Sequence, residues 1–207
     1  AMYYNRDIFN TAGIAKPAVT WEEFNNQVEL LTKFDSSGNI VQAGAAIGSA
    51  KNINRSTDIL MAMMIQSGVQ MVSPTREIAT FSQSVNGMSV GETALQYYTD
   101  FTNPAKRTYS WNENQHYSID AFAEGTVATM FNYSHQIDLL RSKNPRLNFA
   151  VAPIPQTNLA DSRTYANYWT PTVAAGTKYP AQAWTLRQYL GSAQGARSYL
   201  LATNRPA

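Results

Sequence analysis

A chain of 207 residues is long enough to bury a substantial hydrophobic core without disulfides or bound metal. Hydrophobic residues make up 44% of it and aromatic residues 12%, which excludes an intrinsically disordered protein. Only 14% of the residues are charged, against about 25% in an average globular protein. With 17 Asn and 12 Gln in their place, we expect a surface rich in amide groups.

The net charge of +2 comes from scattered Lys and Arg residues without a basic stripe, which argues against nucleic acid as a partner. The longest apolar run, residues 59–65, is far shorter than the ~20 residues that span a bilayer. The absence of Cys excludes thiolate metal sites and a Cys nucleophile, and it suits an oxidising compartment. Because Ala1 precedes Met2, we expect the chain to be a fragment.

The first clear helix is predicted to begin at Thr20-Trp21-Glu22-Glu23. In this capping box the Thr20 hydroxyl accepts a hydrogen bond from the Glu23 N–H, and Glu23 reaches back to the Thr20 N–H. Apolar side chains then recur every three or four residues, and they predict one buried helix face that ends at the turn 36–39. These side chains are Trp21, Phe24, Val28, Leu31 and Phe34.

The remaining pattern alternates helices with short strands, which predicts an α/β layer fold. Further helices are predicted at 56–66, capped by Ser56 or Thr57, at 89–101 after a second capping box, and at 118–122, 134–142, 180–190 and from Ser192 onward. Strands are predicted at 3–8, 40–47, 126–131, 147–152 and 168–174, with a hairpin around Pro74. Residues 153–164, rich in Pro, Asn, Asp and Ser, are predicted as a linker or domain crossing.

Signals of enzymatic chemistry are few. Neither His116 nor His135 lies in a G-x-S-x-G motif. Glu113, His116 and Asp120 have the spacing of metal ligands on a helix, but their polar neighbours favour a solvated loop, so we expect no metal and no cofactor. A carboxylate pair drawn from Glu92, Glu113 and Glu124 remains the rival hypothesis, that of a carbohydrate-active hydrolase.

Aromatic residues outside the helical stripes offer a second kind of chemistry. The helical periodicity around Trp21 and Trp184 predicts that both belong to the core. Trp111 and Trp169 lie among Tyr and Asn residues, a combination that binds neutral polyols through a flat ring and amide groups. An aromatic core beneath polar loops is the equally open alternative.

Three segments, taken in order, resemble motifs of the extracellular solute-binding proteins of bacterial ABC importers, which include sugar-binding lipoproteins. Residues 3–9 (YYNRDIF), with Pro17 and residues 20–24 (TWEEF), resemble the opening of the second lobe in this family. Residues 122–130 (FAEGTVATM) and 148–155 (NFAVAPIP) resemble a helix–turn–strand and a strand of that lobe. The match extends over nearly the whole chain.

The resemblance implies two α/β lobes joined by crossing strands, with the ligand held between them by hinge closure. We therefore expect a periplasmic-binding-protein-like lobe over residues 2–164, with a central mixed sheet flanked by helices and an incomplete second lobe. Residues 165–207 would hold the crossing strand and helices of the other lobe. Such a chain would be about half of a family member, and we expect its orphaned helices from Pro180 onward to self-associate.

The implied function is that of an extracytoplasmic, non-enzymatic component of an ABC transporter. It captures a small polar ligand, in the first place a saccharide, and delivers it to a membrane permease, with membrane attachment only through a lipid anchor outside the chain. The residues that would contact the ligand are Asn132, Tyr133, Ser134, His135, Asn167, Tyr168, Trp169, Asn54, Arg55 and Ser56, with Trp111 added by its chemistry. Family members commonly have a Trp where this chain has Tyr133-Ser134-His135.

Overall fold

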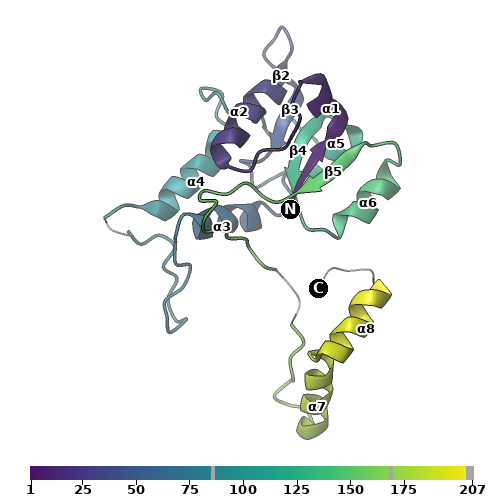
Figure 1. Cartoon of the computed structure of the whole chain (residues 1–207). Helices are drawn as coiled ribbons and strands as arrows, with labels where there is room; N and C mark the ends of the chain where they lie inside the picture. Colours follow the sequence, from purple (N-terminus) through teal and green to yellow (C-terminus); the bar gives the residue numbers. More distant parts are fainter. Residues whose placement is uncertain (85–86, 168–169, 204–207) are drawn as a thin grey trace. The chain divides into compact units, whose positions relative to one another are not determined.

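The computed structural model describes residues 1–84, 87–167 and 170–203. The chain divides into two compact units, Ala1–Tyr165 and Ala166–Ala207. The larger unit contains the sheet and six helices, and the smaller unit contains two helices (Figure 1).

The sheet of the larger unit has five strands in the order β2-β3-β4-β1-β5. Their bounds are β1 Met2–Asn5, β2 Lys33–Phe34, β3 Ile40–Ala46, β4 Val127–Phe131 and β5 Phe149–Ala152. Strand β4 runs parallel to β3 and antiparallel to β1, and the outer pairs β1/β5 and β2/β3 are antiparallel. The predicted fold class, a mixed sheet flanked by helices, is confirmed.

Helices cover both faces of this sheet. Their bounds are α1 Arg6–Thr11, α2 Trp21–Leu31, α3 Ser56–Gln66, α4 Val90–Asp100, α5 Ser118–Glu124 and α6 Gln136–Lys143. Helix α2 packs Phe24 against Phe131 of β4, whereas α5 packs Phe122 against Tyr3 of β1. Met2, the neighbour of Tyr3, pairs with Phe131 across the two strands. Because successive side chains of a strand point to opposite faces, Phe131 and Tyr3, and with them α2 and α5, lie on opposite faces of the sheet.

The start of α2 follows the predicted capping box with one difference. The Thr20 hydroxyl accepts from the Glu23 N–H at 3.2 Å, as predicted. The Glu23 carboxylate, however, accepts from the N–H of Val19 and not of Thr20. The helix ends earlier than predicted, because Thr32 has extended dihedral angles. Phe34 therefore lies in β2, stacks on Tyr109 and is 47% exposed, so its predicted place on the buried helix face is wrong.

Two further predicted helix starts differ in their caps. Arg55, in the left-handed region at φ 63°, precedes α3, and neither Ser56 nor Thr57 caps that helix. Ser89 precedes α4 without a capping hydrogen bond from its side chain. Both helices form where they were predicted, and their apolar residues, such as Met63 and Ala94, lie in the core. Tertiary burial thus stabilises these helices without the local cap.

The smaller unit consists of α7 Pro180–Leu190 and α8 Ala193–Thr203. The predicted cap of α8 is present, because the Ser192 hydroxyl accepts from the Gly195 N–H at 3.1 Å. Residues 170–174 have no strand geometry, so this part of the predicted strand 168–174 is wrong, and residues 168–169 lie outside the described residues. Trp184 is 52% exposed, and α7 buries none of its residues. The prediction that Trp184 belongs to the core is therefore wrong.

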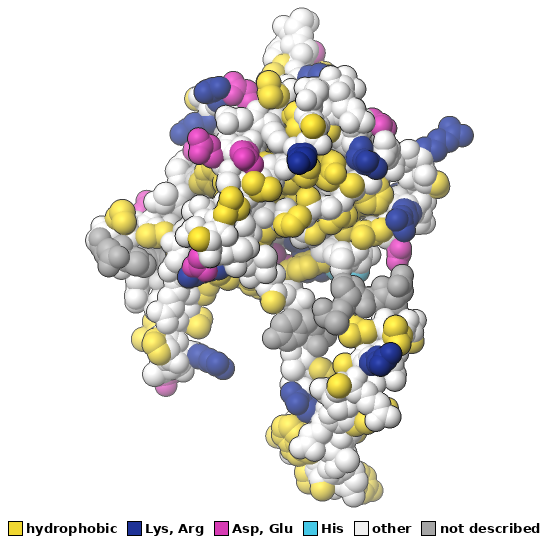
Figure 2. Space-filling view, viewed as in Figure 1, with side chains coloured by type: hydrophobic (Ala, Val, Ile, Leu, Met, Phe, Trp, Pro, Cys, Tyr) yellow, Lys and Arg dark blue, Asp and Glu magenta, His cyan; other side chains and the backbone are white. Residues whose placement is uncertain are grey.

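The described helices include none that is both long and apolar enough to cross a bilayer. On the face of the molecule in Figure 2, Lys and Arg side chains are dispersed and partly interleaved with Asp and Glu. Arg107, for example, pairs with Glu29 and Lys143 with Asp120.

Candidate functional site

A cavity of about 200 Å³ opens at the strand ends of the sheet in the larger unit. Strands β4 and β5 end there and the antiparallel β1 begins there, so residues of all three strands lie close together. Carboxyl ends of strands are the usual location of ligand sites in open α/β sheets. The lining residues are Ala1, Trp21, Arg55, Asp58, Ile59, Ala62, Phe131, Asn132, Tyr133, Pro153, Ile154, Gln156, Ser162, Thr164 and Tyr165.

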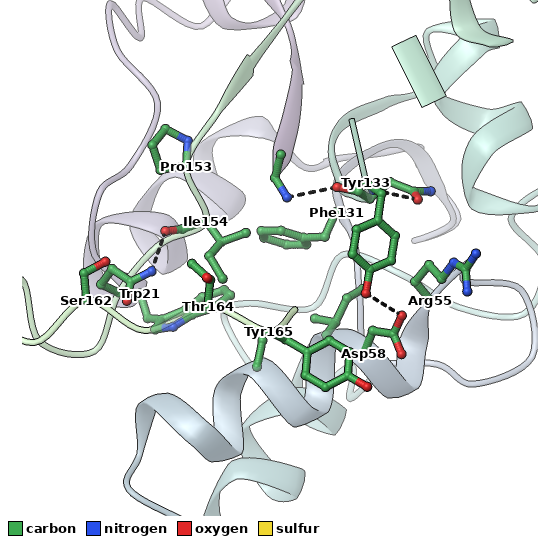
Figure 3. A pocket seen from close by; sticks show the side chains of 15 residues that line it. Trp21, Arg55, Asp58, Phe131, Tyr133, Pro153, Ile154, Ser162, Thr164 and Tyr165 are labelled. Carbon is green, nitrogen blue, oxygen red and sulfur yellow. Dashed lines mark hydrogen bonds between the residues drawn. The ribbon is translucent and has the colours of Figure 1, made fainter. Parts of the chain in front are cut away.

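Aromatic rings form much of the cavity wall. Trp21 and Phe131 are almost buried, with ring centroids 5.7 Å apart, and Tyr133 and Tyr165 are half-buried. Figure 3 shows Phe131 and Ile154 side by side between Trp21 and Tyr133, with Tyr165 below them. The wall therefore offers flat apolar faces to a bound molecule.

Tyr133 is held at both its backbone and its hydroxyl. Its carbonyl accepts from the Tyr3 hydroxyl at 2.6 Å, and its own hydroxyl donates to Asp58 Oδ2 at 2.8 Å. Arg55 Cζ lies 5.4 Å from the centroid of the Tyr133 ring, a cation–π distance. Burial raises the pKa of Tyr3 to about 12, so this residue remains a hydrogen-bond donor well into the alkaline range. The Tyr133 ring is thus oriented before any ligand arrives.

Figure 3 shows Arg55 on one side of the Tyr133 ring and Phe131 and Ile154 on the other. All three residues line the cavity. His135 stacks nearly parallel to the same ring, with centroids 6.0 Å apart. Arg55 has a positive φ of 63°, a backbone conformation that residues other than glycine rarely adopt and that clusters at functional sites.

Asn132 joins the cavity to the loop before α3. Its side-chain Nδ2 donates to Asn54 Oδ1 at 3.0 Å, and its Oδ1 accepts from the N–H of Tyr133. Asn54 in turn donates its backbone N–H to Ser118 Oγ and its amide to the Tyr117 hydroxyl. This chain of bonds fixes the segment that carries Arg55.

Three of the residues predicted to contact a ligand line the cavity, namely Asn132, Tyr133 and Arg55. Their neighbours in the sequence, Ser134, His135, Asn54 and Ser56, do not line it. Asn167 belongs to the smaller unit, and Tyr168 and Trp169 lie outside the described residues.

Trp111 is a correction to the predicted site. Its side chain is fully buried, and its indole N–H donates to Asn52 Oδ1 at 2.9 Å. The Asn52 amide donates in turn to the carbonyls of Asn112 and Gln115. Trp111 therefore anchors its own loop in the core and presents no ring surface to a ligand, which is the alternative that composition left open.

Several lining residues were not among those predicted from the sequence, notably Trp21, Asp58 and Tyr165. Helical periodicity correctly assigns Trp21 to the core, where it is 9% exposed. The same periodicity does not indicate that Trp21 also lines the cavity. Asp58 lies one helical turn after Arg55, and this spacing to a predicted ligand residue was the available signal. Tyr165 directly follows residues 153–164, which were predicted as a linker or domain crossing.

The carboxylates suggested for hydrolysis lie outside the cavity, and those suggested for a metal site are paired with other side chains. None of Glu92, Glu113 and Glu124 lines the cavity. Glu113 forms an ion pair with Lys51, Glu124 bonds His116, and Asp120 bonds Lys143. Among the described residues, no group of three or more His, Asp or Glu side chains is placed to hold a metal ion.

A family model described as bacterial extracellular solute-binding protein matches residues 1–207. Comparison with curated protein sequences finds no significant match. Many solved structures are similar in fold. One is an ABC transporter solute-binding protein from Thermotoga lettingae bound to α-D-tagatose, at 19% identity and a TM-score of 0.61, covering 99% of this chain and 50% of that one.

Two other similar structures come from other bacteria. An ABC substrate-binding protein from Listeria monocytogenes in complex with cycloalternan has 14% identity and a TM-score of 0.66, covering 100% of this chain and 50% of that one. A maltotriose-binding protein from Thermus thermophilus has 20% identity and a TM-score of 0.56, covering 98% and 50%. The present chain thus spans about half the length of these proteins. The resemblance inferred from the three sequence segments is confirmed: the chain belongs to the family of bacterial extracellular solute-binding proteins.

Proposed function

We propose that this chain supplies one side of the ligand site of an extracytoplasmic saccharide receptor. The observation that carries the proposal is the cavity at the strand ends, where the rings of Trp21, Tyr133 and Tyr165 stand beside polar groups of Arg55 and Asn132. Aromatic faces pack against the C–H surface of a sugar ring, and polar groups at the edge bind its hydroxyls. The saccharides in the similar solved structures support the same ligand class.

The cavity of about 200 Å³ is smaller than the roughly 300–1,000 Å³ of pockets that enclose a drug-sized ligand. A site formed between two lobes would have this property when one lobe is considered alone. We therefore expect this chain by itself to bind a saccharide weakly, because the remaining contacts would come from the facing lobe. Ser134, His135, Asn54, Ser56, Asn167, Tyr168 and Trp169 remain proposed contacts of the closed site.

Delivery of the ligand to an ABC permease completes the proposed function. In this proposal the ligand is bound and released without any covalent change. The chain belongs to a family of solute-binding proteins, which supports the proposal. We also propose that α7 and α8 mediate self-association of this chain, since Trp184, Leu186 and Leu190 are about half exposed.

The test is a titration of the chain with a panel of mono- and oligosaccharides, observed by saturation-transfer NMR, which detects weak binding. Tyr133→Ala removes the oriented ring and is expected to weaken binding roughly tenfold. Tyr133→Phe keeps the ring and loses the hydroxyl that bonds Asp58, so a smaller loss is expected. Tyr109→Ala is the matched control, because Tyr109 is equally half-buried but stacks on Phe34 outside the cavity. Equal losses in Tyr133→Ala and Tyr109→Ala, or no binding of any saccharide, would contradict the proposal.

A further inference from the structure

One wall of the cavity is made by a segment without regular secondary structure. Residues 155–165 follow β5, and Gln156, Ser162, Thr164 and Tyr165 from this segment line the cavity. Gln156 is joined to the start of α2 by backbone bonds, with its N–H donating to the Val19 carbonyl. For residues 157–165, the backbone–backbone hydrogen bonds of the described part of the chain are limited to a turn from the Asp161 N–H to the Asn158 carbonyl. The backbone alone therefore does not fix this wall.

Two glutamine side chains supply what the backbone does not. Gln156 Oε1 accepts from the Arg163 N–H at 2.8 Å. Gln66, the last residue of α3, donates from Nε2 to the carbonyls of Pro155 and Arg163, both at 3.1 Å. The N–H and the C=O of Arg163 are thus both bound by glutamine amides. Ser162 and Thr164, which flank Arg163, are held in the wall by these bonds.

Gln66 also holds the neighbouring wall of the cavity. Its Oε1 accepts from the Trp21 indole Nε1–H at 2.6 Å. One half-buried amide on α3 therefore connects Trp21, at the start of α2, with Pro155 and Arg163, which come after the last strand of the sheet. Figure 3 shows Trp21, Ser162 and Thr164 together at the end of the cavity away from Tyr133.

We propose that Gln66 is a positioning residue for the ligand cavity, and that its amide sets both the orientation of Trp21 and the position of segment 155–165. Indole nitrogen has a single N–H, and Gln66 already accepts from it. Trp21 consequently offers a ligand its ring face and no hydrogen-bond donor. The consequence for ligand binding rests on the proposed function, whereas the structural role of Gln66 does not.

Two substitutions distinguish the acceptor Oε1 of Gln66, which binds Trp21, from its donor Nε2, which binds two carbonyls. Gln66→Glu keeps an oxygen that accepts from Trp21 but places a second acceptor against the carbonyls of Pro155 and Arg163. Gln66→Met has a similar shape and can make none of the bonds to Trp21, Pro155 and Arg163, nor accept from the Thr157 hydroxyl as Gln66 Oε1 does. Gln96→Met is the control, because Gln96 is an exposed glutamine on α4 whose amide bonds only Asp100.

Amide hydrogen exchange of Arg163, whose N–H is bound by Gln156, and the ¹H–¹⁵N resonance of the Trp21 indole are measured on the whole chain. We expect exchange to become about tenfold faster in both Gln66 variants and unchanged in the control, because local opening replaces the lost bonds. The indole resonance is expected to shift in Gln66→Met and to stay near its wild-type position in Gln66→Glu. Should Gln66→Met not fold, Gln66→Glu decides alone. Exchange within about twofold of wild type in the folded Gln66 variants, or an equal acceleration in Gln96→Met, would overturn the proposal.

A saccharide titration distinguishes failure of this inference from failure of the proposed function. With the tightest saccharide of the panel, Gln66→Glu is expected to bind about tenfold more weakly while its Tm stays within about 4 °C of wild type. Affinity equal to that of wild type would overturn the positioning role. Faster exchange in a protein that binds no saccharide would uphold the structural role of Gln66 and refute the saccharide site.

Discussion

The two units of this chain contain equally well formed helices but bury very different amounts of apolar surface. In the larger unit, each of α2, α3, α4 and α5 buries three or more residues. In the smaller unit, α7 buries no residue and α8 buries only Gly195. Trp21 and Trp184 occupy helices of the same length, and they are 9% and 52% exposed.

This difference shows that helix formation and core formation have separate causes in the chain. Helices α7 and α8 carry strong local signals, with Pro180 in the first turn of one and the Ser192 cap before the other. The buried faces of the larger unit depend on a sheet to pack against, as Phe24 on Phe131 and Phe122 on Tyr3 demonstrate. Local signals place a helix, and a partner surface buries it.

The largest expected effect is in the aromatic core. Phe122 is fully buried between Tyr3 and Phe149, so Phe122→Ala is expected to lower the free energy of unfolding by about 3–5 kcal/mol. Trp184→Ala is expected to change it by less than about 0.5 kcal/mol and to reduce self-association. Urea denaturation and light scattering measure the two quantities. A loss of stability in Trp184→Ala as large as that in Phe122→Ala would show that the smaller unit has a core of its own.

Two glycines, one in each unit, compare how closely the backbone of the two units is packed. A Cβ at Gly44 would lie 2.5 Å from the Val28 carbonyl oxygen, where β3 touches α2. Gly44→Ala is therefore expected to cost about 1–3 kcal/mol in the free energy of unfolding, because backbone must move to admit the methyl group. At Gly176 a Cβ would have no heavy atom within 4 Å, and Gly176→Ala is expected to be neutral or slightly stabilising. Equal denaturation midpoints for the two variants would contradict this expectation.

The smallest effect concerns alkaline pH. Burial raises the pKa of Tyr3 from 10.0 to about 12 in the folded chain. Because the unfolded chain releases this proton first, the contribution of Tyr3 to stability is complete below pH 10 and is lost between about pH 10 and 12. Burial also raises the pKa of Tyr97 and Tyr98, in the same direction. All three tyrosines belong to the larger unit.

Tyr3→Phe removes both this titration and the bond to the Tyr133 carbonyl. We expect the variant to be about 1 kcal/mol less stable than wild type at about pH 9, and the difference to shrink at about pH 11. Urea denaturation at the two pH values provides the measurement. An equal stability difference between the variant and wild type at both pH values would show that the pKa of Tyr3 is the same in the folded and the unfolded chain.

Much of the fold follows from local patterns in the sequence. The capping hydroxyl of Thr20, the short helix from residue 118 and the apolar strand at 126–131 were all predicted, and all are present. These features depend on residues within a few positions of one another. One failed prediction involves a distant residue. Phe34 was expected on the buried face of a helix, but it lies in β2 and stacks on Tyr109.

The sequence predicted only part of the candidate site. Asn132 and Tyr133, which follow the strand at 126–131, and Arg55, which precedes α3, line the cavity, and we propose that they contact the ligand. Asp58 and Gln66 lie at either end of the apolar run 59–65 of α3, and because that run is apolar all round, nothing in its periodicity marks the face turned toward the cavity. Their roles depend on Tyr133 and Arg163, which are 75 and 97 positions away in the chain.

The amino-acid sequence by itself determined most helix and strand positions, the α/β class and the family, because these follow from short-range patterns and from motifs in a fixed order. The predicted strand 3–8 was wrong beyond Asn5, because residues 6–8 belong to α1. Only the tertiary structure decided that Trp111 is core and that Trp21 borders a cavity, and it exposed Trp184 against expectation. Ring burial depends on which strand or helix is packed beside the ring. That partner is brought there by the fold of the whole unit, and the residues next to a tryptophan in the sequence do not specify it.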